Sequence, residues 1–205
     1  MSRSTLRRAL RAGALCLTAT TTAAVIPAAV DAKVGVSAKR LNITTGSRVT
    51  VKGRTAAPMT ASLQIQRHGR WVTLDRDRTN RAGKFVLRKR LRGAMSTRAR
   101  VRLNNGETRV IGRLNVYRRA LASWYGPGLF GNKLGCGGTL QVGSLGVANK
   151  SLPCGTKVTI RHRGRVVRVR VIDRGPYVGG REYDLTAATA RKLGFSGHGV
   201  VEVTR

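Results

Sequence analysis

The segment Ile172-Asp173-Arg174-Gly175-Pro176-Tyr177 places an acidic side chain at the point where a predicted strand ends. Valine occupies every second position from 167 to 171, which is typical of a β-strand with one buried face. Gly175 and Pro176 then turn the chain, the first because it is permissive and the second because it is rigid. We therefore expect Asp173 to be held in a fixed orientation and exposed to a ligand.

Three other segments accompany this motif. They are Ala122-Ser123-Trp124-Tyr125-Gly126-Pro127-Gly128, Leu152-Pro153-Cys154-Gly155-Thr156-Lys157-Val158 and Tyr183-Asp184-Leu185-Thr186. With the Asp-Arg-Gly-Pro motif, they make the stretch from Ala122 to Val203 resemble the RlpA-like double-psi β-barrel family. That family includes septal lytic transglycosylases of peptidoglycan and is related in fold to expansins and barwin-type proteins. The resemblance implies a six-stranded barrel with a short helix, but because one fold hosts many functions the activity must be argued from the site.

Local patterns in this half predict individual elements. Residues 157–161 and 166–172 alternate on either side of a short Gly-containing turn, which predicts a β-hairpin. Thr186 is a predicted N-cap for a helix over residues 187–193, and Gly194 is expected to end that helix. Residues 199–203 predict a final strand.

The first half of the chain repeats short alternating runs separated by Gly, Asn or polar turns. These runs cover residues 48–53, 61–67, 70–74, 84–88, 99–103 and 110–117. They predict an antiparallel β-sandwich that resembles immunoglobulin-like domains of exported bacterial proteins. We expect Trp71 to face its core, and the alternative is an exposed ring that stacks on sugars. Arg118-Arg119-Ala120 is predicted to be a basic linker. The expected protein is therefore all-β, with a sandwich over residues 33–117 and a barrel over residues 118–205.

Residues 1–32 are predicted to be a secretion signal. Four arginines precede an Ala/Leu/Thr/Val run, and Val30-Asp31-Ala32 provides a small-residue cleavage site. The alternative is a transmembrane anchor, but threonines and Pro27 interrupt the apolar run before about 20 residues are reached. We expect a secreted protein, extracellular or associated with the cell wall, without stable membrane insertion once the signal and its Cys16 have been removed.

Cys136 and Cys154 are the cysteines that would remain after export. An even pair in an oxidising compartment favours a disulfide, which for a loop of this length contributes roughly 3 kcal/mol in the chain-entropy model. The alternative is a pair of buried free thiols. No His or acidic residue stands near either cysteine at a metal-ligand spacing, so we expect neither a metal site nor another cofactor.

The chain carries a formal net charge of +32 at pH 7, and removal of four Arg and one Asp with the signal would leave +29. A secreted polycation attracts polyanions, which outside a bacterial cell are acidic wall polymers, peptidoglycan carboxylates and anionic lipids. Nucleic acid is the usual partner of such a charge. It is disfavoured here by the export signal, by the scarcity of aromatic residues and by the absence of a nucleic-acid-binding motif.

Cleavage of a glycan needs a proton donor for the leaving oxygen and a group that activates the nucleophile. The resembled family carries a Glu after its first barrel strand and a His before its Leu-Pro pair. Here the Gly138 region and Asn149 stand at those places, whereas Asp173 and Asp184 are present. Asp173 is the candidate catalytic or glycan-contacting acid. The alternative is a structural carboxylate that accepts backbone N–H bonds in the turn.

Six further side chains are candidates for substrate binding. They are Trp124, Tyr125, Asn149, Arg174, Tyr177 and Asp184. Aromatic rings can stack on sugar faces, Asn149 can form hydrogen bonds but cannot shuttle a proton, and Arg174 can pair with an anionic stem peptide. Packing in the core and structural hydrogen bonds are the alternatives for these residues.

Two functions therefore compete. The first is a wall protein that binds peptidoglycan glycan strands through the barrel during wall remodelling. The second is an active peptidoglycan lytic transglycosylase that uses Asp173. A cationic protein that acts on nucleic acid or membranes is a third alternative, disfavoured for membranes because the charge lies on strand patterns and not on an amphipathic helix.

Overall fold

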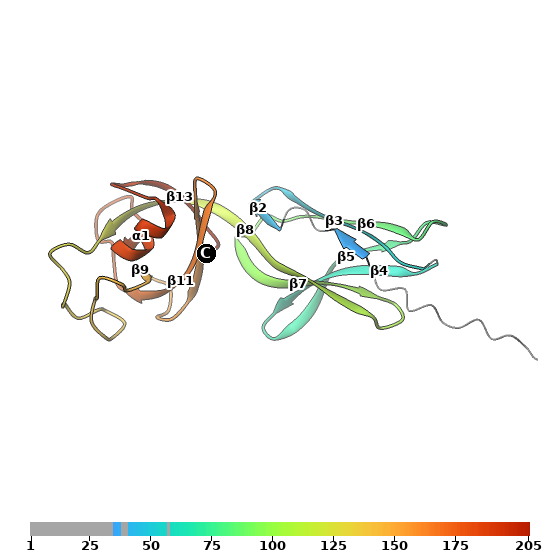
Figure 1. Ribbon diagram of the computed structural model, residues 1–205, viewed down its shortest axis with the longest axis horizontal. Helices are drawn as coiled ribbons and strands as arrows, with labels where there is room; N and C mark the ends of the chain where they lie inside the picture. Colours follow the sequence, from blue (N-terminus) through green and yellow to red (C-terminus); the bar gives the residue numbers. More distant parts are fainter. Residues whose placement is uncertain (1–34, 38–40, 57) are drawn as a thin grey trace, which may run out of the picture. The chain divides into compact units, whose positions relative to one another are not determined.

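The computed structural model describes residues 35–37, 41–56 and 58–205 (Figure 1). These residues form thirteen strands and one short helix, as the all-β prediction requires. The predicted secretion signal over residues 1–32 lies outside the described residues. Within the described part of the chain, no helix has the length and apolar character needed to span a membrane.

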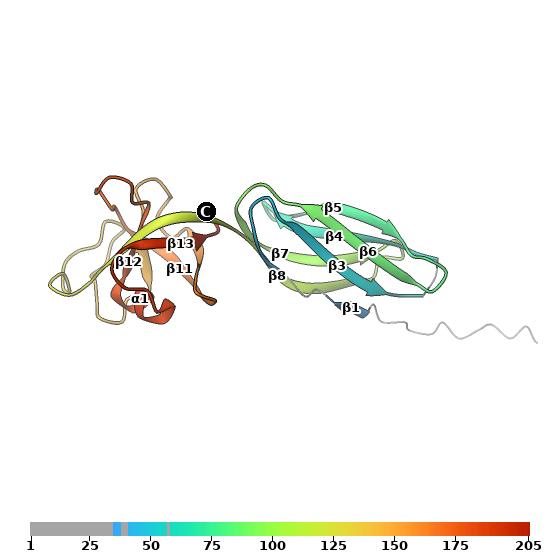
Figure 2. The same cartoon turned by 90° about the horizontal axis from the view of Figure 1, so that it is seen from above.

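Two sheets of the N-terminal half share one apolar core. Their strands are β1 (Gly35–Ser37), β2 (Asn42–Thr44), β3 (Arg48–Arg54), β4 (Thr60–Arg67), β5 (Arg70–Arg78), β6 (Lys84–Arg90), β7 (Met95–Leu103) and β8 (Thr108–Tyr125). The first sheet has the order β1-β3-β6, with β3 and β6 side by side in Figure 2. In the second, β5-β4-β7-β8 are neighbours and β2 pairs with β8. Buried residues of both sheets form a single cluster. The immunoglobulin-like assignment of this half stays a prediction.

Trp71 does not face that core, contrary to the sequence-based expectation. It pairs with Gln66, which follows the buried Ile65 and therefore lies on the other side of the sheet. The Arg100 guanidinium lies over the Trp71 ring, 4.1 Å from its centroid. Val72, the neighbour of Trp71, pairs with Ile65, so regular alternation along β5 places Trp71 on the opposite face from the core.

Six strands of the C-terminal half close into a ring. They are the end of β8, β9 (Gly146–Ala148), β10 (Lys157–His162), β11 (Arg165–Asp173), β12 (Tyr183–Thr186) and β13 (Gly199–Val203). The order β12-β9-β11-β10-β13-β8 is completed by pairing of β12 with β8. Two of the pairings, β11–β9 and β12–β8, are parallel, and the others are antiparallel. The result is the mixed six-stranded barrel with its own apolar core.

The helix α1 (Ala187–Leu193) confirms the sequence-based prediction at both ends. The side chain of Thr186 accepts a hydrogen bond from the Thr189 N–H, as an N-cap does, and Gly194 adopts the left-handed conformation that ends many helices. The predicted hairpin of β10 and β11 and the predicted final strand β13 are also present.

The predicted basic linker is part of a strand. Arg118, Arg119 and Ala120 lie within β8 and pair with Val203, Glu202 and Val201 of β13. The two arginines suggested a linker between domains. Closure of the barrel instead gives the backbone N–H and C=O groups of these three residues hydrogen-bond partners on a neighbouring strand. Arg118 also forms an ion pair with Glu182, with Nη2 and Oε2 separated by 2.7 Å.

Candidate functional site

Four residues from four adjacent barrel strands stand in one row across the sheet. Ser123 of β8 pairs with Asp184 of β12, Asp184 pairs with Ala148 of β9, and Ala148 pairs with Asp173 of β11. Residues in register on neighbouring strands point to the same face of a sheet. The two carboxyl groups therefore flank the small side chain of Ala148, with backbones about 10 Å apart, which is two strand spacings.

A β-bulge turns Asp173 away from the barrel core. Val171 pairs with Val147, and both belong to the core cluster, so simple alternation would send Asp173 to the same side as Val171. The register shifts between Val171 and Asp173, which places Asp173 opposite Ala148. Bulges commonly re-aim a side chain beside a functional site. Gly146 makes room for the bulged Ile172, because a Cβ at Gly146 would lie 2.2 Å from Ile172 Cδ1.

Backbone N–H groups hold the Asp173 carboxylate. Its Oδ1 accepts hydrogen bonds from the Gly135 N–H at 2.7 Å and from the Arg174 N–H at 2.8 Å. Two backbone N–H donors on one carboxylate oxygen fix the orientation of the side chain. Asp173 therefore accepts backbone N–H bonds in the turn, as the structural alternative for this residue predicted. Its side chain also lines a groove.

The groove has a volume of about 250 Å³ and contains both acids. Its lining residues come from β8 and the loop after it, from β9, from the end of β11 and the loop after it, and from β12: Tyr125, Leu129, Ala148, Asp173, Arg174, Gly175, Pro176, Tyr177, Val178, Arg181 and Asp184. Tyr177 is 80% exposed and stands at the rim with the exposed Val178. Aromatic, apolar and acidic groups thus share one solvent-accessible depression.

The second acid has a different environment from the first. Burial raises the pKa of Asp184 above its ordinary value, and the Asp173 charge acts in the same direction, while Ser123 and Arg181 lower it. Burial, with the charges of Asp173 and Asp184, also raises the pKa of the Tyr125 phenol, which therefore stays protonated. Asp184 Oδ1, Ser123 Oγ and Tyr125 Oη are buried without a partner in hydrogen-bond geometry among the described residues. The Ser123 and Tyr125 hydroxyls approach the two carboxyl groups without reaching that geometry.

Comparison with known proteins agrees with this architecture. Residues 118–205 match the family model described as "Lytic transglycolase". The Synechocystis protein named "Probable endolytic peptidoglycan transglycosylase RlpA" is 45% identical over 85 residues, 40% of this chain and 26% of that protein. The Aquifex aeolicus protein of the same name is 42% identical over 87 residues, 42% of this chain and 38% of that protein. The C-terminal half is an RlpA-like double-psi β-barrel.

The chain thus spans only 26% and 38% of the length of these two relatives. A third, the Campylobacter jejuni "Endolytic peptidoglycan transglycosylase RlpA", is 42% identical over 85 residues, 40% of this chain and 31% of that protein. Among solved structures, the Streptomyces papain inhibitor aligns with a TM-score of 0.33 and 21% identity, over 43% of this chain and 94% of that one.

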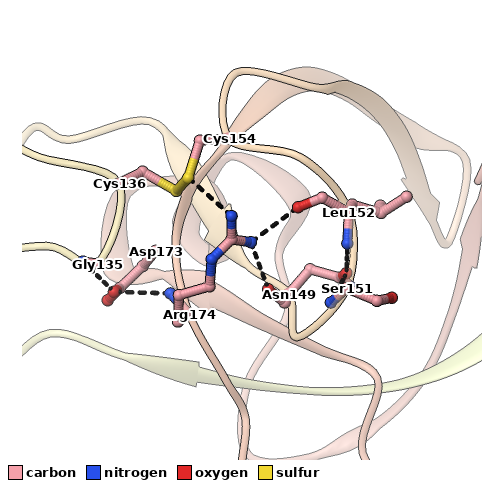
Figure 3. Close-up of a disulfide and its surroundings, with 8 residues drawn as sticks. All are labelled: Gly135, Cys136, Asn149, Ser151, Leu152, Cys154, Asp173 and Arg174. Carbon is pink, nitrogen blue, oxygen red and sulfur yellow. Dashed lines mark hydrogen bonds between the residues drawn. A yellow bond between two sulfur atoms is a disulfide. The ribbon is translucent and has the colours of Figure 1, made fainter.

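The RlpA-like barrel contains the expected disulfide, with Cα atoms of Cys136 and Cys154 5.5 Å apart. Beside it, the Arg174 guanidinium donates to the carbonyls of Asn149 and Leu152 at 3.1 and 2.7 Å (Figure 3). It also donates to Cys154 Sγ at 2.9 Å. The forked donors of Arg174 therefore hold the loop of residues 149–154, and are not directed at an anionic ligand.

Asn149 has a structural position as well. It is buried, and its side-chain amide donates to the Glu182 carbonyl at 2.9 Å. Its Oδ1 accepts the N–H groups of Ser151 at 3.1 Å and Leu152 at 2.8 Å. Asn149 does not line the groove of the RlpA-like barrel, so we do not include it among the proposed ligand contacts. Gly138 lies in an exposed loop with a φ of 79°.

The two aromatic residues of the Ser123-Trp124-Tyr125 stretch separate because neighbouring residues of a strand point to opposite faces. Tyr125 lines the groove, whereas Trp124 lines a different, largely apolar pocket with Phe130, Ala187 and Phe195. The structure therefore brings Tyr125, Asp173, Arg174, Tyr177 and Asp184 together, and leaves Trp124 and Asn149 outside the groove.

Sequence reasoning missed three residues of the site. Ser123 and Ala148 complete the row of four, and Arg181 lines the groove and lowers the Asp184 pKa. The alternation of Ser123 with Tyr125 was a usable signal, but the importance of Ala148 depends on strand pairing that the sequence does not state. In the described part of the chain, no group of three or more His, Cys, Asp or Glu side chains could hold a metal ion.

Proposed function

We propose that the RlpA-like barrel binds peptidoglycan glycan strands in the groove of Asp173, as part of a secreted protein of the cell wall. The observation that supports this most directly is the row of two carboxyl groups on either side of Ala148. Carboxylates accept hydrogen bonds from sugar hydroxyls, and the exposed Tyr177 ring offers a face for stacking. The relatives named above are peptidoglycan transglycosylases by name.

The test is sedimentation of the purified protein with peptidoglycan sacculi. Asp173→Asn keeps an oxygen that can accept the Gly135 and Arg174 N–H groups but removes the charge, so folding is retained while contact with sugar hydroxyls weakens. We expect the dissociation constant to rise roughly 5- to 30-fold, the effect of losing about 1–2 kcal/mol from a charged hydrogen bond.

Glu182→Gln is the matched control. Glu182 is an exposed carboxylate two positions before Asp184, and its side chain pairs with Arg118 instead of lining the groove. The control should bind sacculi as the unmodified protein does. Equal affinities for the Asp173→Asn variant and the control would remove Asp173 from the binding site and contradict the proposal.

Cleavage of the strand by a lytic transglycosylase reaction is the second candidate function. It is favoured by the position of Asp173, whose carboxylate is fixed by two backbone N–H groups yet lines the groove. Fixed charge at the reacting position is the arrangement by which enzymes stabilise a transition state. The diagnostic product is a 1,6-anhydro-muropeptide, detected by mass spectrometry after incubation with sacculi.

The charge of the chain supports a location at the cell wall. The net charge of +32 gives long-range attraction to the carboxylates and phosphates of wall polymers. Such attraction would concentrate the protein on its substrate before the groove engages a glycan strand. It does not select one sugar from another, so we assign selectivity to the groove.

A further inference from the structure

A second pocket of the RlpA-like barrel lies apart from the groove of Asp173. Its volume is about 430 Å³, within the range of small-ligand pockets, and none of its described lining residues lines the groove. Basic side chains predominate in the lining, which consists of Arg113, Leu145, Lys157, Arg168, Val169 and Arg170. We call it the basic pocket, because four cations of the chain meet there.

Three of the four cations come from the β10–β11 hairpin. Val158 and Val169 belong to the core cluster. Because neighbouring residues of a strand point to opposite faces, Lys157, Arg168 and Arg170 lie on the outer face of the barrel. Lys157 is directly opposite Arg170 in the pairing of the two strands. Like charges in directly opposite positions destabilise a sheet, so stability of the fold does not explain this arrangement.

Acidic side chains do not neutralise the basic pocket. Those described between positions 118 and 205 are engaged elsewhere: Asp173 and Asp184 line the groove, Glu182 pairs with Arg118, and Glu202 pairs with Arg161. Partial burial, followed by the charges of Arg113 and Arg205, lowers the pKa of Arg168. Arginine nevertheless stays protonated near neutral pH, so an anion bound in the pocket would offset the repulsion among these groups.

The chemistry of the basic pocket matches phosphate groups. Each guanidinium presents a planar fork of donors that fits the oxygens of a phosphate, and Lys157 adds a compact charge. Arg168 and Arg170 are two residues apart on β11, which separates their backbones by about 7 Å. Several cations at this spacing suit a ligand with successive negative charges. No aromatic ring is among the described residues of the pocket, so the bases of a nucleic acid have no stacking partner there.

We propose that the basic pocket binds the phosphate groups of a polyol phosphate polymer of the cell wall. The choice of a wall polymer rests on the location proposed above, whereas the site rests on the four basic side chains. Strand β11 joins this site to the groove, because Arg170 pairs with Gly146 and Asp173 pairs with Ala148, about 10 Å apart on the outer face. A glycan strand that carries a phosphate-linked polymer would therefore contact both sites.

The first experiment is calorimetric titration of the purified chain with soluble poly(glycerol phosphate). Arg168 is exposed, so Arg168→Gln should fold as the unmodified chain does. We expect the dissociation constant to rise roughly 5- to 30-fold, the effect of losing one charge-assisted hydrogen bond. Arg168→Lys keeps the charge but loses the fork of donors, and should weaken binding by a smaller factor.

Arg163→Gln is the matched control. Arg163 is exposed in the turn of the same hairpin and does not line the basic pocket. The variant removes the same charge, one of forty basic residues, so the dissociation constant should stay almost unchanged. Equal weakening by Arg163→Gln and Arg168→Gln would show that only bulk charge acts, and would overturn the site.

Three further probes separate the sources of negative charge. They are oligothymidylate with the same number of phosphates, vesicles of phosphatidylcholine and phosphatidylglycerol, and polyglutamate. We expect each to bind more weakly than poly(glycerol phosphate) and to respond less to Arg168→Gln. Tighter binding of any of them that depends on Arg168 would assign the basic pocket to nucleic acid, lipid or carboxylate, and would overturn the assignment to a polyol phosphate polymer.

The second experiment separates this proposal from the binding function of the groove. Sacculi stripped of phosphodiester-linked polymers with hydrofluoric acid report the groove alone, and soluble poly(glycerol phosphate) reports the basic pocket alone. A chain that sediments with stripped sacculi but does not bind the soluble polymer overturns the basic pocket and leaves the proposed function standing. A chain that binds the soluble polymer through Arg168 but not stripped sacculi supports the basic pocket and overturns glycan binding in the groove.

Discussion

The Asp173 carboxylate has a structural role that is compatible with the functional role proposed for it. Its Oδ1 fixes the loop through the Gly135 N–H and the turn through the Arg174 N–H, so its own orientation is fixed in return. The same group lines the groove. The structural and functional interpretations that stood as alternatives for this residue are therefore compatible.

The raised pKa of Asp184 predicts how the stability of the folded protein depends on pH, independently of any catalytic role. Its folded-state pKa is raised above the ordinary value of 3.8, so the protein loses stability as pH rises from near that value through the folded-state pKa. Asparagine cannot ionise. The melting temperature of Asp184→Asn should therefore increase relative to that of the unmodified chain over this range and then reach a constant offset.

Thermal unfolding at a series of pH values on both sides of 3.8 tests this sign. The Glu182→Gln variant provides the comparison, because Glu182 is an exposed carboxylate with a neighbouring arginine. A difference between Asp184→Asn and the unmodified chain that shrinks as pH rises would show that the folded protein prefers the ionised form of Asp184.

At the scale of secondary structure elements, the short strand β9 and the bulge in β11 determine the site. β9 lies between β11 and β12, so its outward residue Ala148 becomes the floor between the two acids. The bulged Ile172 occupies the space that a side chain at Gly146 would need. Gly146 and Ile172 together thus decide which face of the strand presents Asp173.

Gly146→Ala should disturb that arrangement. The new methyl group would lie 2.2 Å from Ile172 Cδ1 and 2.3 Å from Cγ1, so the strand or the isoleucine must move. We expect a loss of about 1–3 kcal/mol in the free energy of unfolding, typical of overpacking, together with weaker binding to sacculi. Urea unfolding and sedimentation measure the two effects.

Gly143→Ala is the control for this prediction. Gly143 has open space where a Cβ would be added, and its φ lies outside the left-handed region. It should unfold and bind as the unmodified chain does. If Gly146→Ala matched it in both measurements, the packing of Ile172 on Gly146 would not be what positions Asp173.

At the scale of the whole molecule, charge and groove are two separable contributions to binding. Forty basic and eight acidic residues give the chain a strong general attraction to polyanions. Such attraction is screened by salt, with a Debye length of about 8 Å at physiological ionic strength and about 3 Å at 1 M. Hydrogen bonds and ring contacts within the groove depend on salt much less.

Sedimentation with sacculi at low and high NaCl should therefore show two components. Total binding falls as salt rises, whereas the ratio of dissociation constants for Asp173→Asn and the unmodified chain persists. Loss of that ratio at about 1 M NaCl would mean that Asp173 acts only through bulk charge. The Glu182→Gln variant, which removes an acid outside the groove, should follow the unmodified chain at both salt concentrations.

The sequence by itself determined the local elements of the C-terminal half. Thr186 and Gly194 specify the ends of α1 because capping is a local hydrogen-bonding and backbone problem. The β10–β11 hairpin and the Cys136–Cys154 disulfide were also predictable, the first from alternation around a turn and the second from an even cysteine pair. Motifs spread over about eighty residues indicated the barrel family before any pairing was known.

Only the tertiary structure decided which of the candidate residues meet. Strand pairing places Ser123, Asp184, Ala148 and Asp173 in one row, although they are distant in the chain. A bulge reverses the face of Asp173, and the barrel face of β8 on which Trp124 lies borders another pocket. Composition likewise suggested a linker at Arg118-Arg119-Ala120, where closure of the barrel makes a strand. Register and closure arise from contacts between remote segments, and local residue patterns do not contain them.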